Sequence, residues 1–128
     1  MKITNEQLDG VSKTPMYEWI VNRIKGHGQE YRHDYIYEVI NSGCGSCIES
    51  DLVYTDDAVA FHDKFESEIW DKLETDAADF GHKSIIEFIA TFNGIEHVSD
   101  LRYLKNTLVW YTYERAMQEI ADLLELNL

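Results

Sequence analysis

Two cysteines separated by two residues are the part of the sequence whose residue types could carry chemistry. Cys44 and Cys47 can exchange disulfides or bind a metal ion. A redox site of the thioredoxin kind needs a strand before the pair, and no strand pattern precedes it. His62 and Glu66 follow at a spacing similar to that of a zinc finger, with glutamate in place of the last histidine. Glutamate is an uncommon ligand in closed zinc sites, so we expect two small buried thiols, with zinc binding as the alternative.

A second pattern, Glu30-Tyr31-Arg32-His33, places glutamate and histidine three residues apart on a predicted helix. Di-iron carboxylate bundles use this motif twice, and the sequence contains no second Glu-x-x-His. We therefore interpret these side chains as a hydrophilic helix face. The sequence also has no phosphate-binding glycine loop and no nucleophile elbow. We expect a protein that is not an enzyme and that needs no cofactor.

Acidic residues are concentrated between Glu49 and Asp79. This stretch contains eleven acids but only Lys64 and Lys72 as bases, a net charge of −9. The whole chain of 128 residues carries −13, which disfavours direct binding of nucleic acid or of an anionic membrane. The concentration can be interpreted as a solvated helix face or as a surface for a partner protein.

Residues 56–79 within this stretch are predicted to form one long helix. Its apolar residues recur every four positions, which indicates a single buried stripe with His62 beside it: Phe61, Phe65, Ile69 and Leu73. The candidate partner-binding residues lie on the anionic side: Asp56, Asp57, Asp63, Glu68, Asp71, Glu74 and Asp79. The twenty-four residues carry nine acids over about 36 Å of helix, and one strand of B-DNA carries about ten phosphates over that length. Such a helix could mimic nucleic acid.

The remaining helices are predicted from N-terminal caps and from glycine or asparagine-glycine stops, over residues 15–25, 29–42, 85–92 and about 100–125. Residues 1–13 are polar and are expected to form an arm. Residues 43–55 are expected to form a short helix or an irregular connection. Because no segment alternates strictly between apolar and polar residues, we predict an all-α domain over residues 1–128, a bundle of five or six helices.

The cellular setting follows from what the sequence lacks. It has no apolar run approaching the roughly 18 residues of a membrane span. Its N-terminus also lacks the apolar region of a signal peptide. We therefore expect a cytoplasmic protein with reduced cysteines, in the cytoplasm of the host cell if a phage encodes it.

Four local features mark the segment from residue 42 to residue 120: Gly43-Cys44 followed by Ser46, the run Leu52-Val53-Tyr54, the helix from Phe61 to Trp70, and the turn Phe92-Asn93-Gly94. With these features the segment resembles a family of small acidic proteins of unknown function found in phages, plasmids and bacterial genomes. The resemblance implies no activity and no catalytic residue. It implies an origin in a mobile element.

Three functions are consistent with these observations. The favoured one is a protein that binds and inhibits a host or defence protein through its anionic face, such as an anti-CRISPR or anti-restriction factor. The second is an adaptor that forms a homodimer or a larger oligomer through aromatic residues, of which the candidates are Trp70, Trp110, Tyr103 and Tyr111. The third is a small zinc-binding protein that uses Cys44, Cys47, His62 and Glu66.

Overall fold

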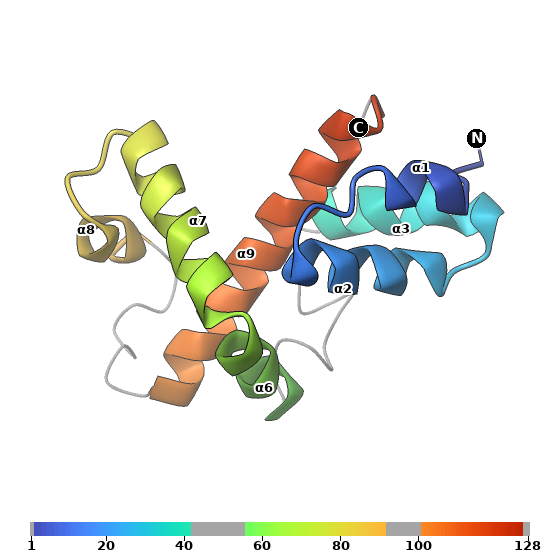
Figure 1. The fold of residues 1–128 in the computed structure, drawn as a ribbon. Helices are drawn as coiled ribbons and strands as arrows, with labels where there is room; N and C mark the ends of the chain where they lie inside the picture. The colour runs from blue at the N-terminus through green and yellow to red at the C-terminus, as the bar shows by residue number, and fades with distance from the viewer. Residues whose placement is uncertain (1, 42–55, 92–100, 127–128) are drawn as a thin grey trace. The chain divides into compact units, whose positions relative to one another are not determined.

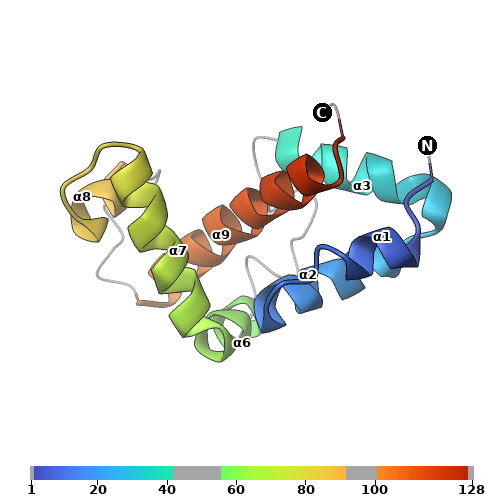
Figure 2. The same cartoon turned by 45° about the horizontal axis from the view of Figure 1, so that its top comes forward.

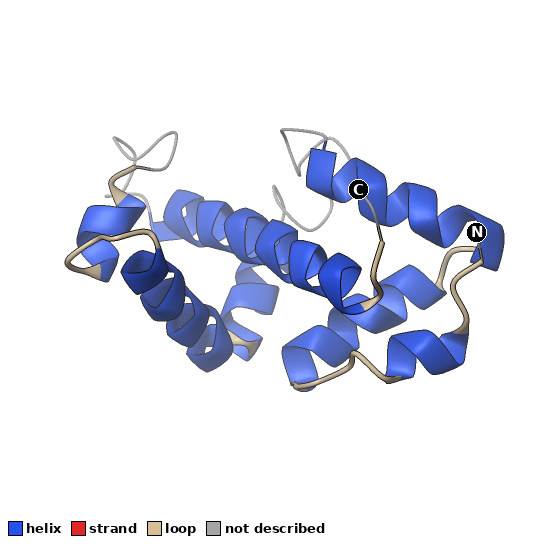
Figure 3. Ribbon diagram, turned by 90° about the horizontal axis from the view of Figure 1, so that it is seen from above, coloured by secondary structure: helices blue, strands red, loops and turns tan. Residues whose placement is uncertain are grey.

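The fold is entirely helical in the part of the chain that the computed structural model describes, residues 2–41, 56–91 and 101–126 (Figure 1). For residues 56–57 and 101–103 only the backbone is described. Seven helices lie in these ranges, and Figure 3 shows no strand among them: α1 (Asn5–Asp9), α2 (Pro15–Lys25), α3 (Gln29–Asn41), α6 (Asp56–Lys64), α7 (Glu66–Asp79), α8 (Ile85–Ile89) and α9 (Leu101–Leu123). The prediction of an all-α fold is confirmed, with more helices than the five or six expected.

Contacts within the chain group into two compact units. The first unit contains residues 1–48 and 113–128, and the second contains residues 49–112, so that the boundary falls inside α9. The expectation of a single domain stays a prediction.

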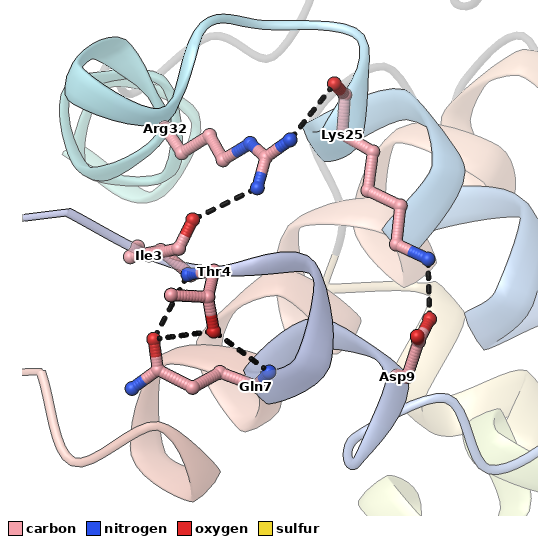
Figure 4. Close-up of polar contacts among 6 residues, drawn as sticks. All are labelled: Ile3, Thr4, Gln7, Asp9, Lys25 and Arg32. Atoms are coloured by element: carbon pink, nitrogen blue, oxygen red, sulfur yellow. Dashed lines mark hydrogen bonds and ion pairs between the residues drawn. The ribbon is translucent and has the colours of Figure 1, made fainter.

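The segment expected to be a polar arm contains a capped helix, α1, which packs on α2 in the first unit (Figures 1 and 2). The Oγ1 atom of Thr4 accepts a hydrogen bond from the backbone N–H of Gln7 at 3.1 Å, and Oε1 of Gln7 accepts one from the N–H of Thr4 at 2.9 Å (Figure 4). This reciprocal capping box begins the helix. Ile3, Leu8 and Val11 are buried, which orders the segment.

Arg32 of α3 joins the N-terminal segment to the turn between α2 and α3 (Figure 4). Its side chain is only 5% exposed, and its three guanidinium nitrogens donate to the backbone carbonyls of His27 at 3.1 Å, Ile3 at 2.8 Å and Lys25 at 3.1 Å. The carbonyl of Lys25 lies at the C-terminal end of α2, where helical partners are missing, and that of His27 lies in the turn that follows. Lys25 also forms an ion pair with Asp9. Arg32 is therefore a structural residue and does not belong to a hydrophilic helix face.

The helices α2 and α3 begin and end close to the predicted positions. Thr14 caps α2 through its Oγ1 atom, and Pro15 occupies the first turn. The core of the first unit lies between these helices and residues 113–123 of α9. Tyr35 and Tyr113 share a hydrogen bond of 2.5 Å between their buried hydroxyl groups, and Trp19 packs edge-on against Tyr113.

The long helix predicted over residues 56–79 is interrupted at Phe65. This residue has φ −113° and ψ 23°, outside the helical region, and it separates α6 from α7. The four residues of the predicted stripe are nevertheless all buried: Phe61, Phe65, Ile69 and Leu73. The ring of Phe65 packs edge-on against that of Phe61, with centroids 4.9 Å apart. The acidic residues therefore do not lie along one straight rod.

In the second unit, α7 ends near Gly81, as the sequence predicts. Gly81 has φ +81°, a left-handed conformation that favours glycine, just beyond the end of the helix. Ser84 then caps α8 by accepting a hydrogen bond from the N–H of Glu87 at 3.1 Å. Phe88 packs edge-on against Tyr111 of α9. The predicted cap at Ser99 lies outside the described residues.

Candidate functional site

The candidate partner-binding acids have different environments in the structure. Five carboxylates of α6 and α7 are exposed and Glu68 is half-buried; the exposed residues are Asp63, Glu66, Asp71, Glu74 and Asp79. Asp56 and Asp57 lie in α6, but their side chains are outside the described residues. Glu66 was not among the predicted partner-binding residues and appeared only in the alternative zinc site, with Cys44, Cys47 and His62.

Asp76 is the acid of α7 whose environment differs most from the others. It is only 3% exposed, and one of its carboxylate oxygens accepts a hydrogen bond from the hydroxyl of Tyr111 at 2.7 Å. Asp76 belongs to the core of the second unit, and this carboxylate does not contribute to the anionic surface. The sequence gives a weak signal for this burial, since Asp76 lies three residues after Leu73 on the apolar side of the helix.

Asp63 is an exposed acid whose charge is partly neutralised. Its Oδ1 atom accepts a hydrogen bond from the ammonium of Lys105 at 2.8 Å and lies 3.0 Å from Nδ1 of His62. The hydrogen bond from Lys105, supported by the one from His62, lowers the pKa of the Asp63 carboxyl below its ordinary value. Asp63 therefore holds α6 to α9 and is a poor candidate for a partner contact.

The Asp63 contacts predict a pH dependence of stability. A carboxyl whose pKa is lower in the folded chain stabilises the fold above its unfolded pKa of about 3.9, and this contribution disappears as the pH falls through the folded value. We expect Asp63→Asn to unfold at a lower urea concentration than the wild type near neutral pH. Urea titrations should show that this gap closes as the carboxyl is protonated. A gap that is the same at neutral and strongly acidic pH would contradict the assignment.

Four exposed carboxylates differ from Asp63 in having no cationic partner in the described part of the chain. Glu66, Asp71, Glu74 and Asp79 make no ion pair with any residue that the structure describes. Asp71 and Glu74 are three residues apart, so they lie on the same face of α7. We call Glu66, Asp71 and Glu74 the acidic surface, since none of them is ion-paired in the described part of the chain.

A hollow of about 570 Å³ lies next to the bend at Phe65. It is wide open to solvent, and residues of both helices line it: Asp63, Lys64, Glu66, Ser67, Trp70 and Asp71. The indole N–H of Trp70 donates to Nε2 of His62 at 3.3 Å. Residues eight apart in a straight helix are about 12 Å apart along its axis, so the bend is what allows these two side chains to meet.

His62 uses both of its ring nitrogens in this arrangement. The indole N–H is a donor only, so Nε2 of His62 must accept, and Nδ1 then carries the hydrogen that faces Asp63. The ring is 4% exposed, as its position beside the apolar stripe predicts. Neither nitrogen has a lone pair left for a metal ion while these bonds persist.

The zinc hypothesis gains no support from the part of the chain that is described. Cys44 and Cys47 lie outside the described residues, and Glu66 is exposed. Among the side chains that are described, no three histidine, cysteine or acidic residues lie close enough together to hold a metal ion. The role of the two cysteines stays a prediction.

The aromatic residues predicted for an adaptor are partly covered. Trp70, Trp110 and Tyr111 are half-buried, and the side chain of Tyr103 lies outside the described residues. The large apolar side chains that are exposed were not predicted, because each lies within an apolar helix pattern or beside one: Tyr31, Tyr37, Phe80, Ile86 and Leu123. Ile86 is 82% exposed, the highest fraction among them.

Comparison with known proteins identifies a family of unknown function. No curated protein and no solved structure matches the sequence. No helix in the described ranges is long and apolar enough to cross a membrane. Residues 13–126 match a family described as a domain of unknown function, DUF7222. This match includes the segment whose features resemble an uncharacterised family and extends it towards the N-terminus. The chain belongs to the DUF7222 family.

Proposed function

We propose that this protein has no enzymatic activity and that it binds a basic surface of a partner protein through its acidic surface. The observation that carries the proposal is the exposure of Glu66, Asp71 and Glu74 without a cationic partner among the described residues. Like charges that are close together repel one another, and a basic partner removes this repulsion on binding. Complementary charge also accelerates the encounter between two proteins.

The proposed partner is a host or defence protein, and the proposed origin of the chain is a phage or a plasmid. The resemblance of residues 42–120 to proteins from mobile elements supports this origin. A small acidic protein from such an element could inhibit a host protein by binding the basic surface with which that protein binds nucleic acid. Mimicry of a straight nucleic-acid strand has less support than charge complementarity alone. It requires one continuous helix from Asp56 to Asp79, and Phe65 interrupts that helix.

Affinity capture with matched baits tests the proposal. The acidic-surface variant carries Glu66→Lys, Asp71→Lys and Glu74→Lys. The control variant makes the same change in net charge at exposed acids of α3 and α9, with Asp34→Lys, Glu38→Lys and Asp122→Lys. Tagged wild type and both variants are incubated with a lysate of the bacterium that carries the gene. The captured proteins are then eluted with increasing salt.

We expect the wild type and the control variant to retain the same protein and to release it at moderate salt. The acidic-surface variant should retain none of it, although its helix content and melting temperature stay close to those of the wild type. Equal capture by both variants would contradict the proposal, because a general effect of net charge would then explain the binding.

Self-association is a second candidate function. Phe80 is 55% exposed and Ile86 is 82% exposed, and both lie near the turn between α7 and α8. Exposed apolar residues of this size often mark protein interfaces. Light scattering separates the two candidates, since an oligomer held by these residues persists at high salt and dissociates in the double variant Phe80→Ser, Ile86→Ser.

A further inference from the structure

The hollow at the bend between α6 and α7 combines an aromatic side chain with carboxylates. We propose that it receives an arginine side chain of the partner protein, with the guanidinium against the indole of Trp70. This inference rests on the proposed function and adds the chemistry by which the partner is recognised.

Trp70 is held in place before any partner arrives. Its indole N–H is bonded to Nε2 of His62, and the two rings meet edge-on with centroids 6.5 Å apart. His62 is itself buried and bonded to Asp63. A half-buried indole fixed in this way loses little conformational entropy when a second group packs against it. Trp70 therefore lines the hollow with a preorganised aromatic ring that can form a cation–π contact.

Two exposed carboxylates without an ion-pair partner in the described ranges line the hollow together with Trp70. Glu66 precedes Trp70 by one helical turn and Asp71 follows it directly, and neither makes an ion pair within the described residues. A guanidinium can stack on an aromatic ring and donate to carboxylates in its own plane at the same time, because its donors form a planar fork. An ammonium is a compact and strongly hydrated charge without this plane. The combination therefore favours arginine over lysine.

The size and openness of the hollow suit a side chain that projects from a partner surface. Its volume lies within the range of ligand sites in proteins, but it is open on one side and does not enclose a small molecule.

Lys64 also lines the hollow, and its ammonium lies over the ring of Phe65 at 5.4 Å. This resident cation opposes a second one. Removing it in Lys64→Gln should therefore strengthen arginine binding about two- to threefold.

The test uses the full-length protein and two blocked peptides of equal length and charge. In one peptide glycine alternates with arginine, and in the other glycine alternates with lysine. We expect the arginine peptide to bind at least about threefold more tightly. Nuclear magnetic resonance should show a shift of the Trp70 indole N–H signal, assigned from the spectrum of Trp70→Phe, and contacts between arginine side-chain protons and the indole ring.

Trp70→Leu should weaken binding of the arginine peptide about five- to tenfold and should remove the preference over lysine. If this variant melts well below the wild type, the contacts observed on the wild-type protein decide the question. Arginine-peptide binding that leaves the Trp70 signals unchanged would overturn the arginine site. If the acidic-surface variant nevertheless fails to bind the arginine peptide, the proposed function stands without the arginine site. Failure of the arginine site is therefore distinguishable from failure of the proposed function.

Discussion

Replacing Arg32 with alanine is expected to lower the free energy of unfolding by about 3–4 kcal/mol. The guanidinium donates to three backbone carbonyls, at His27, Ile3 and Lys25, in a position that is almost fully buried. Its removal leaves these carbonyls without a partner and releases the N-terminal segment from the turn between α2 and α3. Urea unfolding of the wild type and of Arg32→Ala measures the difference.

Two matched variants show whether the effect comes from the hydrogen bonds of Arg32. Arg32→Lys keeps the positive charge but cannot donate to three carbonyls from one plane, so it should recover less than half of the lost stability. Lys13→Ala removes an exposed positive charge near the same segment and should change stability by no more than about 0.5 kcal/mol. An Arg32→Ala protein as stable as Lys13→Ala would show that the carbonyls find water instead.

Replacing Tyr111 with phenylalanine is the second substitution with a large expected effect, a loss of about 2 kcal/mol. The hydroxyl of Tyr111 donates to the carboxylate of Asp76 at 2.7 Å, and Asp76 is 3% exposed. The variant keeps the ring that packs against Phe88 and removes the hydroxyl that donates to the buried carboxyl group of Asp76. Tyr37→Phe removes a hydroxyl from a tyrosine that is 50% exposed and should have almost no effect on unfolding by urea. Equal stability of the two variants would contradict the role given to Asp76.

The boundaries of α2 and α3 could be predicted because their signals are local. Thr14 and Pro15 supply a cap and a preset first turn, and Gly26 follows the last residue of α2. The same holds for the start of α8, which Ser84 caps, whereas α8 ends at Ile89 and not at the predicted residue 92. The buried stripe of α6 and α7 was also predictable, since the apolar residues keep one spacing throughout.

The bend at Phe65 could not be predicted from that spacing. An apolar residue every four positions satisfies a straight helix and a bent one equally, and no proline or glycine lies between Asp56 and Asp79 to indicate an interruption. The bend is accompanied by the packing of Phe61 against Phe65 and by the hydrogen bond between Trp70 and His62. Both contacts become visible only in the folded chain.

The division of the acids into buried, paired and uncompensated residues also depends on tertiary structure. Asp63 is paired with Lys105, which lies 42 positions along the chain. Asp76 is bonded to Tyr111, which lies 35 positions away. Charge counting placed Asp63 on the partner-binding face and passed over Glu66. In the structure Asp63 is paired with Lys105 and Glu66 is exposed, and both residues line the hollow beside Trp70.

The central claim is that Glu66, Asp71 and Glu74 hold a basic partner. Its most direct test is the affinity of the captured partner for the wild type, the acidic-surface variant and the control variant, measured over a series of salt concentrations. The claim predicts a steep loss of affinity with salt for the wild type and the control variant. It predicts weak binding with a shallower salt dependence for the acidic-surface variant. The same affinity and the same salt dependence for all three proteins would contradict it.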